Sequence, residues 1–149
     1  MKIKEALGID VSKKTIDVRL HGEGGYHQFE NKNKGFSTML IWLKKQTGLR
    51  LDQVLICFEH TGLYSLPLAV FLTDQQILFS MVSALEIKRS LGIVRGKNDK
   101  VDAQRIAEYA YLRRDQLKAF VLPSTSILRL QKLLALRERM VKQRAGYSV

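Results

Sequence analysis

The stretch ALGIDVSKKTIDVRL, residues 6–20, decides the fold of this chain. Residues 6–11 form an apolar run that contains one carboxylate, Asp10, near its end, and residues 12–14 are typical of a turn. Residues 15–20 then alternate between apolar and polar side chains, which is the period of a half-exposed strand. The stretch therefore predicts an antiparallel hairpin whose first strand is buried and ends in an acidic side chain.

The pattern beyond the hairpin predicts alternating strands and helices. Glycines mark the next turn, and a third antiparallel strand follows. Two later apolar runs have the composition of strands that are covered on both faces. The predicted elements are a strand at 26–29, a helix from a cap at Asn33 to Gly48, a strand at 53–58, a helix from 61 to about 75, a strand at 77–82, and helices at 84–91 and from Asp99 to about 112.

This order of elements is that of the ribonuclease H-like fold, an α/β class in which helices flank a mixed sheet. In such a sheet the first and fourth strands can lie side by side. Asp10 and Glu59, at the ends of these two strands, would then project toward the same edge, where ligands collect in open α/β sheets. After Pro123 the pattern predicts an extended C-terminal helix with a wide apolar stripe, which either packs on its own domain or pairs two chains as a coiled coil.

A second acidic feature lies in the stretch GKNDKVDAQR, residues 96–105. Asp99 and Asp102 are three positions apart, so they would share a face if both lay on the predicted helix. One interpretation is a helix cap, with Asn98 or Asp99 at the N-cap and Asp102 in the first turn. The other is a cation site, since two neighbouring anions repel unless a positive charge lies between them. These two residues alone favour neither interpretation.

Composition narrows the class of protein. With 149 residues and 46% hydrophobic content the chain can bury one core. Its single cysteine, Cys57, excludes a disulfide within the chain, and no apolar run is long enough to cross a bilayer, so we expect a cytoplasmic protein. The net charge is +11, and residues 84–149 hold 15 Lys and Arg against 6 Asp and Glu. This excess favours a polyanionic partner, most simply DNA or RNA.

The four carboxylates suggest one site. If the helix that carries Asp99 and Asp102 crosses the edge formed by Asp10 and Glu59, the cluster requires divalent cations, and oxygen ligands select Mg²⁺ or Mn²⁺. Two such ions could activate a nucleophile and stabilise the leaving oxygen of a phosphodiester. The candidates for contacts to the nucleic-acid backbone are Lys13, Arg95, Lys97, Lys100 and Arg105.

Three motifs carry a resemblance to a known family. GIDVSK at 8–13, EHTGLY at 59–64 and KNDKVDA at 97–103 resemble the motifs of the DEDD transposases of bacterial insertion sequences, the insertion sequence 110 group, which includes the Piv-type DNA invertases. The resemblance covers essentially the whole chain. It implies a RuvC-like domain in which Asp10, Glu59, Asp99 and Asp102 bind the metal and support DNA strand cleavage and transfer during transposition.

The resemblance also implies a domain organisation. Residues 1–122 would be the catalytic domain and residues 123–149 the start of a linking or coiled-coil helix, while nothing here matches the C-terminal serine domain of the family. Family members act as oligomers, and many are guided by a bridge RNA. We therefore expect a homo-oligomer formed through the last helix, and a stretch that is not fully active alone.

Other functions stay open at this point. A junction-resolving endonuclease of the RuvC type would use the same carboxylates to hydrolyse DNA directly. The Gly8-Ile9-Asp10 hairpin also occurs in sugar kinases and actin-like ATPases, but the further glycine-rich phosphate loops that those enzymes need are not found. A non-catalytic basic adaptor is the remaining alternative.

Overall fold

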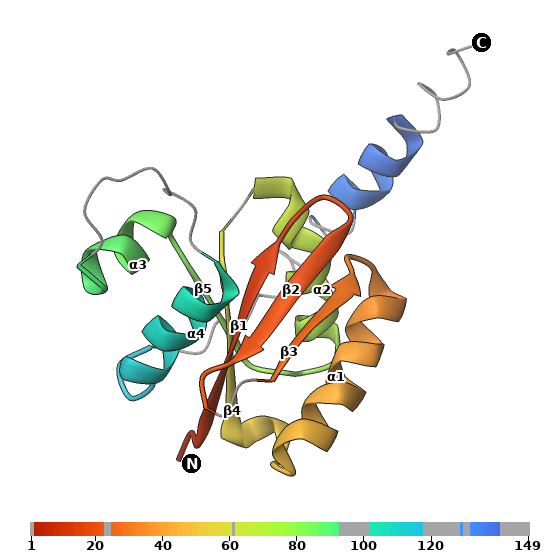
Figure 1. Cartoon of the computed structure of the whole chain (residues 1–149). Coiled ribbons are helices and arrows are strands. Elements are labelled where there is room, and N and C mark those ends of the chain that lie inside the picture. The colour runs from red at the N-terminus through yellow and green to blue at the C-terminus, as the bar shows by residue number, and fades with distance from the viewer. Residues whose placement is uncertain are drawn as a thin grey trace.

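The computed structural model describes residues 2–22, 25–60, 62–92, 102–117, 129 and 132–140. Five strands and four α-helices are arranged as a sheet with helices on both faces (Figure 1). The strands are β1 (Glu5–Val11), β2 (Thr15–Leu20), β3 (Tyr26–Glu30), β4 (Val54–Glu59) and β5 (Phe79–Val82). The helices are α1 (Asn33–Thr47), α2 (Leu66–Asp74), α3 (Ala84–Ser90) and α4 (Ala103–Leu112), with short 3-10 turns η1 (Leu51–Gln53) and η2 (Gly62–Ser65).

The sheet has the strand order β3-β2-β1-β4-β5, which places β1 in its middle. The strands β1, β2 and β3 pair antiparallel, whereas β4 runs parallel to β1 and β5 runs parallel to β4. The register of the central pair runs from Glu5 opposite Val54 to Ile9 opposite Phe58. The prediction that the first and fourth strands are neighbours is thus confirmed, as is the mixed α/β sheet.

The two faces of the sheet are covered by different helices. On one face, α1 and α2 bury a large apolar core that includes Leu7, Ile9, Ile16, Val18, Phe36, Met39, Leu43, Phe58, Leu68 and Leu72. On the other face, α3 and α4 bury a smaller cluster formed by Ala6, Leu55, Cys57, Val82, Ile87, Ile106, Tyr109 and Ala110. Alternate residues of each strand supply the two clusters, because successive side chains of a strand point to opposite faces.

Several predicted boundaries are corrected by the structure. Lys32, and not Asn33, is the N-cap of α1, with extended backbone and no side-chain cap hydrogen bond, while the predicted end at Gly48 is confirmed by its left-handed φ of 64°. The helix predicted from 61 to 75 is divided into η2 and α2, with Pro67 in the first turn of α2, where its missing N–H costs no helical hydrogen bond. The final strand begins at Phe79 and not at residue 77.

The C-terminal helical segment, residues 132–140, lies beside α2 (Figure 1). The guanidinium group of Arg137 lies 4.9 Å from the centre of the Tyr64 ring, which links this segment to η2. Its side chains Leu133, Leu136 and Met140 are about half exposed. The rest of the predicted last helix, apart from Arg129, falls outside the described residues. Within the part of the chain that the structure describes, no helix has the length and apolar character needed to cross a membrane.

Candidate active site

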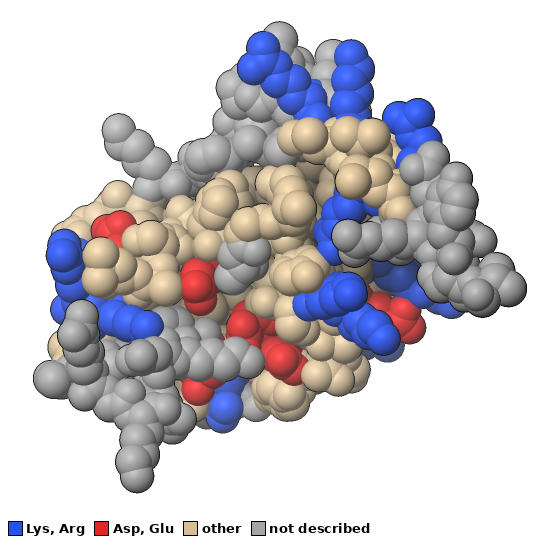
Figure 2. All heavy atoms as spheres, turned by 90° about the horizontal axis from the view of Figure 1, so that it is seen from above, with Lys and Arg blue, Asp and Glu red and all other residues tan. Residues whose placement is uncertain are grey.

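Asp10 and Glu59 lie at the adjacent ends of the two central parallel strands. Each follows the last paired residues of the β1–β4 register, Ile9 and Phe58, by one position. Both carboxylates are partly buried, and both have interactions with their surroundings. Figure 2, which looks down on this end of the sheet, shows acidic side chains near the middle of the face and Lys and Arg side chains toward its sides. The backbone therefore sets Asp10 and Glu59 side by side at one edge of the sheet.

Gly8 lets α4 approach β1 closely enough to complete this edge. A Cβ atom at position 8 would overlap the carbonyl oxygen of Ala103 and the backbone nitrogen of Ala107. The helix contributes small residues at this contact, since Ala103 and Ala107 are both buried. This contact explains why position 8 is a glycine. Any side chain there would push α4, together with Asp102, which precedes it, away from β1.

Asp102 is the N-cap of α4. Its backbone is extended, with φ −85° and ψ 173°, and its Oδ1 accepts a hydrogen bond of 3.0 Å from the backbone N–H of Arg105. The helix therefore begins four residues later than the predicted start at Asp99, and Asp102 is not in its first turn. The predicted position of Asp102 in the first turn is wrong, because its extended backbone caps the helix instead. The predicted arrangement of Asp102 with Asp99 stays a prediction. Asp99 lies outside the described residues.

One cavity brings Asp10 and Asp102 together. It has a volume of about 210 Å³ and is lined by Asp10, Asp17, Arg19, Tyr26, Asp102, Ala103 and Gln104. Asp17 enters the cavity because β2 pairs with β1 in a register that sets Asp17 opposite Asp10. Two residues that are far apart in the sequence thus share one polar hollow, and it is bounded by the hairpin on one side and the start of α4 on the other.

Asp17 has its own hydrogen-bond partners on β3. Its Oδ1 accepts hydrogen bonds of 3.0 Å from the Tyr26 hydroxyl and 3.0 Å from the Gln28 side-chain amide. The hydrogen bond and the negative charge of Asp17 raise the pKa of the Tyr26 hydroxyl above its usual value. Sequence reasoning passed over Asp17, Arg19 and Tyr26, because in a half-exposed strand their pattern does not differ from that of ordinary solvent-facing residues.

The carboxylates fit a divalent cation by their chemistry, since all the candidate ligands are oxygens. Glu59 is the last residue of β4, and His60 follows it. The backbone N–H of His60 donates a hydrogen bond to the carbonyl of Val82, which ties the end of β4 to β5. Within the described ranges no three His, Cys, Asp or Glu side chains are grouped closely enough to hold a metal ion. The fourth predicted ligand, Asp99, lies outside the described residues.

The predicted nucleic-acid contacts are only partly described. Arg105 is half-buried in the first turn of α4, directly after the cap. Lys13 is exposed in the turn after β1 and lines a different hollow, together with Lys14, Asn31 and Arg137. Arg95, Lys97 and Lys100 lie outside the described residues. Lys13 is thus near the strand end of Asp10 but does not line the cavity that Asp10 shares with Asp102.

Asn31 connects the segments that follow the two acidic strand ends. Its side-chain amide donates hydrogen bonds of 2.8 Å to the carbonyl of Ser12 and 3.0 Å to the carbonyl of Tyr64. Ser12 follows Asp10 by two residues, and Tyr64 follows Glu59 by five. Asn31 therefore braces the turn after β1 against η2. No sequence signal pointed to it, because an asparagine after a strand is more simply explained as a turn residue.

The two serines near this edge are engaged in local structure. The Ser12 hydroxyl donates to the carbonyl of Thr15 at 2.9 Å within the hairpin turn. Ser65 is fully buried, and its hydroxyl donates to the carbonyl of Gly62 at 3.0 Å. Both hydroxyls therefore stabilise turns.

Comparison with solved structures defines the class of fold. The chain is similar to the Thermus thermophilus RuvC structure, with a TM-score of 0.50 and 12% sequence identity over 78% of this chain and all of that chain. At this level of identity the likeness concerns the fold, which is RuvC-like and ribonuclease H-like, as predicted. No curated protein matches the chain.

The family follows from the sequence match. The family model of the insertion sequence 110 DEDD transposases, described as "Transposase", matches residues 7–147. Because this match spans nearly the whole sequence, the chain belongs to the DEDD transposase family of insertion sequence 110. It is a transposase catalytic domain, and DNA is its substrate. A divalent metal ion is the cofactor that this family and fold imply.

Proposed function

We propose that DNA strand cleavage and transfer take place at the edge of the sheet where β1 and β4 end, with Asp10, Glu59, Asp99 and Asp102 holding Mg²⁺ or Mn²⁺. The observation that supports this most directly is the cavity that Asp10 and Asp102 line together. Glu59 supports it by its register position beside Asp10. Asp99 enters the proposal only through its place in the family motif, three residues before Asp102.

Each described residue has a distinct task in this proposal. The bound ion would supply positive charge to the phosphodiester that reacts. Asp10 is held by β1, which is hydrogen-bonded on both sides, so its carboxylate has a fixed place at the edge. Asp102 is oriented by the backbone N–H of Arg105 through one carboxylate oxygen, which leaves its other oxygen for the ion. The half-buried Arg105 places a positive charge one turn from this carboxylate.

Substitutions at Asp102 separate its two tasks. Asp102→Ser keeps an oxygen that caps the helix, so stability should fall by only a few tenths of a kcal/mol, whereas Asp102→Ala should cost about 1 kcal/mol. Both variants, like Asp10→Asn, should lose recombination in the full-length protein. They should also lose Mn²⁺-induced stabilisation, which for the unsubstituted protein is about 2.7 kcal/mol at an ion concentration roughly 100 times Kd.

The charge-matched control is Asp74→Asn, at the exposed end of α2. It should keep both the response to Mn²⁺ in a thermal unfolding experiment and the recombination activity. Retention of full Mn²⁺ stabilisation and activity by Asp102→Ser would contradict the assignment of Asp102. Multiple-turnover hydrolysis of branched DNA without strand transfer would instead support the junction-resolving endonuclease alternative.

A homo-oligomer formed through the C-terminal helix is part of the proposal. Leu133, Leu136 and Met140 are spaced by three and four positions on the helical segment 132–140, and each is about half exposed. This is the spacing of a coiled-coil seam. Substitution of all three by Gln should lower the association state measured by sedimentation, and an unsubstituted chain that stays monomeric at high concentration would count against this assembly.

The remaining partners and the domain division rest on the family. We assign residues 1–122 to the catalytic domain and residues 123–149 to the beginning of the linking helix. A guide RNA of the bridge type is a second polyanionic partner, and the charge of +11 is compatible with it. Binding of such an RNA by the full-length protein, measured at physiological salt against an RNA of scrambled sequence, tests this part.

A further inference from the structure

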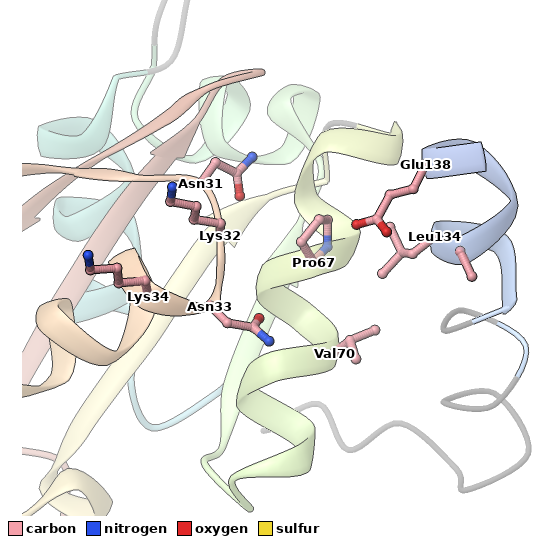
Figure 3. A pocket seen from close by; sticks show the side chains of 9 residues that line it. Asn31, Lys32, Asn33, Lys34, Pro67, Val70, Leu134 and Glu138 are labelled. Atoms are coloured by element: carbon pink, nitrogen blue, oxygen red, sulfur yellow. The ribbon is translucent and has the colours of Figure 1, made fainter. Parts of the chain in front are cut away.

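Two adjoining hollows lie beside the turn that follows β1, away from the Asp10 cavity. Their volumes are about 610 Å³ and about 560 Å³, and Asn31, Pro67, Leu134 and Glu138 line both. Because they share these walls, they form one continuous groove, which we call the lysine groove. Figure 3 shows the larger hollow between the start of α1, the first turns of α2 and the C-terminal helical segment.

The lysine groove is strongly positive. Four lysines line it, Lys13 and Lys14 from the turn after β1 and Lys32 and Lys34 from the start of α1, and Arg137 adds a fifth cation from the opposite wall. Among the described residues that line these two hollows, Glu138 is the one with a carboxylate. All four lysines are exposed, so their ammonium groups can reach a ligand at little desolvation cost.

The local ion pair in this groove does not cancel its charge. Lys32 Nζ lies 2.6 Å from Glu30 Oε2, but both side chains are more than half exposed, at 60% and 63%. Exposed pairs of this kind contribute about 0–1 kcal/mol and exchange readily with other partners. A phosphate that approaches Lys32 therefore competes with a weak contact.

The opposite wall is ordered by contacts with the domain. Arg137 and Leu134 are the partly buried residues of the segment 132–140, and the Arg137 guanidinium lies over the ring of Tyr64 at 4.9 Å. Tyr64 is in turn tied through its carbonyl to Asn31, which lies at the boundary of the two hollows. The groove is thus built from four separate segments of the chain, and it is not a chance run of lysines on one surface helix.

We propose that the lysine groove binds the phosphate backbone of duplex DNA on one side of the phosphodiester that reacts. The inference rests on the proposed function for the place of that phosphodiester, beside Asp10. Lys13 follows Asp10 by three residues, and ~10 Å is the most that an extended chain covers over that length, which the turn at residues 12–14 shortens. Since a DNA strand rises ~3.4 Å per nucleotide, the groove meets the backbone within about three nucleotides of the reacting phosphate.

DNA fits this groove better than an acidic peptide would. The five cations come from three separate segments of the chain that line the groove, whereas the lining residues Pro67 and Leu134 are partly buried and apolar. Repeated charges at regular spacing are what a phosphate backbone presents, and contacts of this kind fix position without reading sequence. The groove would therefore hold the flanking duplex in register for the carboxylates while accepting any base sequence there.

The test compares two quadruple variants of the full-length protein. Lys13→Gln, Lys14→Gln, Lys32→Gln and Lys34→Gln together remove the groove lysines. The matched control removes the same charge from the opposite end of the sheet, with Lys2→Gln, Lys4→Gln, Lys44→Gln and Lys45→Gln, all of which are exposed. Both variants should unfold at the temperature of the unsubstituted protein, because none of the eight side chains is part of the apolar core.

Binding to duplex DNA is measured at several salt concentrations in the presence of EDTA. Because EDTA removes divalent metal ions, a loss of metal binding by a variant cannot change the result. Each lysine that contacts a phosphate contributes about one to the slope of log K against log salt. The groove variant should lose about three to four from this slope, and the control variant less than about one. Equal slopes for the two variants would overturn the groove proposal while leaving the carboxylate site untouched.

A second arm locates the contact and tests its identity. Neutral methylphosphonates within about three nucleotides of the cleavage position should weaken binding by the unsubstituted protein but not by the groove variant, since the same contact is already absent. Equal weakening of both proteins would overturn the proposal. A loss of slope seen with RNA duplex but not with DNA would also overturn it, and would assign the groove to RNA.

Discussion

The two faces of the sheet are built on different principles. The face under α1 and α2 is packed by bulky side chains, with Phe36, Met39 and Leu43 fully buried against the strands. The face under α4 buries a smaller cluster that includes Ile106 and Tyr109, and at Gly8 the strand and the helix approach so closely that a Cβ atom would overlap the helix backbone. The first face therefore supplies most of the apolar burial. The second face buries less apolar area but holds the Asp102 cap close to β1.

This difference shows how a small domain can separate stability from chemistry. Burial of large apolar side chains contributes about 25 cal/mol per Å² and has little need of exact placement. A site made from residues on different elements needs those elements held at one separation. On the α4 face, Gly8 of the strand and Ala103 and Ala107 of the helix are in close contact. This contact sets the separation between β1 and α4.

The largest expected difference between the faces comes from two glycines. Gly8 contacts α4, and Gly35, in α1, would place a Cβ against the carbonyl oxygen of Glu30. Either Gly→Ala substitution forces backbone apart and should lower the free energy of unfolding by about 1–3 kcal/mol. Only Gly8→Ala should also lower the rate of cleavage, by about a hundredfold, because a shift of ~1 Å between Asp10 and Asp102 misplaces the ligands.

Gly35→Ala is the matched control, because it causes a similar clash on the other face. Urea unfolding gives the stability of both variants, and cleavage at saturating DNA together with Mn²⁺ titration gives the state of the site. If both variants lost the same activity at equal folded fraction, the separation of stability from chemistry between the faces would not hold.

A smaller effect should appear at alkaline pH, again on the α4 face. Burial raises the pKa of the Cys57 thiol from 9.0 to about 12. Burial, and then the hydrogen bond to Glu86, raises the pKa of the Tyr109 hydroxyl from 10.0 to about 12, against a smaller lowering by Arg113. Both groups belong to the α4-face cluster.

The direction of the pH effect follows from these shifts. Below pH 9 both groups are protonated in the folded and unfolded chain, so their contribution is complete. As the pH rises toward about 12, the unfolded chain releases these protons before the folded chain does, so the free energy of unfolding falls. Urea unfolding at about pH 8 and about pH 10.5 should show a drop that is smaller in Cys57→Ala/Tyr109→Phe. An equal drop in both proteins would assign the alkaline loss to other groups.

The fold could be predicted from the sequence because its pattern is strongly local. Residues 15–20 alternate strictly, and β2 has the predicted bounds. The buried run that ends at Glu59 is continuous, and β4 is buried along its length up to that residue. Two of the errors lie at helix starts, at Ala103 and Asn33, since a cap and a first-turn residue have similar compositions and only the backbone angles distinguish them.

The site was predictable in part. Asp10, Glu59 and Asp102 were predicted as site residues from motif spacing and strand ends, which depend on residues near in sequence. Asp17 could not be found in this way, because its place opposite Asp10 depends on the register of β1 and β2. The lysine groove was also out of reach apart from Lys13, since its walls come from segments that only the tertiary structure brings together.

The brace formed by Asn31 has a mechanical consequence. One amide group fastens the turn that carries Lys13 and Lys14 to the turn that follows Glu59. A pull on either turn is therefore transmitted to the other through two hydrogen bonds, without passing through the sheet. A force on a nucleic acid bound in the proposed lysine groove would therefore act on the segments that follow both Asp10 and Glu59, which are the two strand ends of the proposed site.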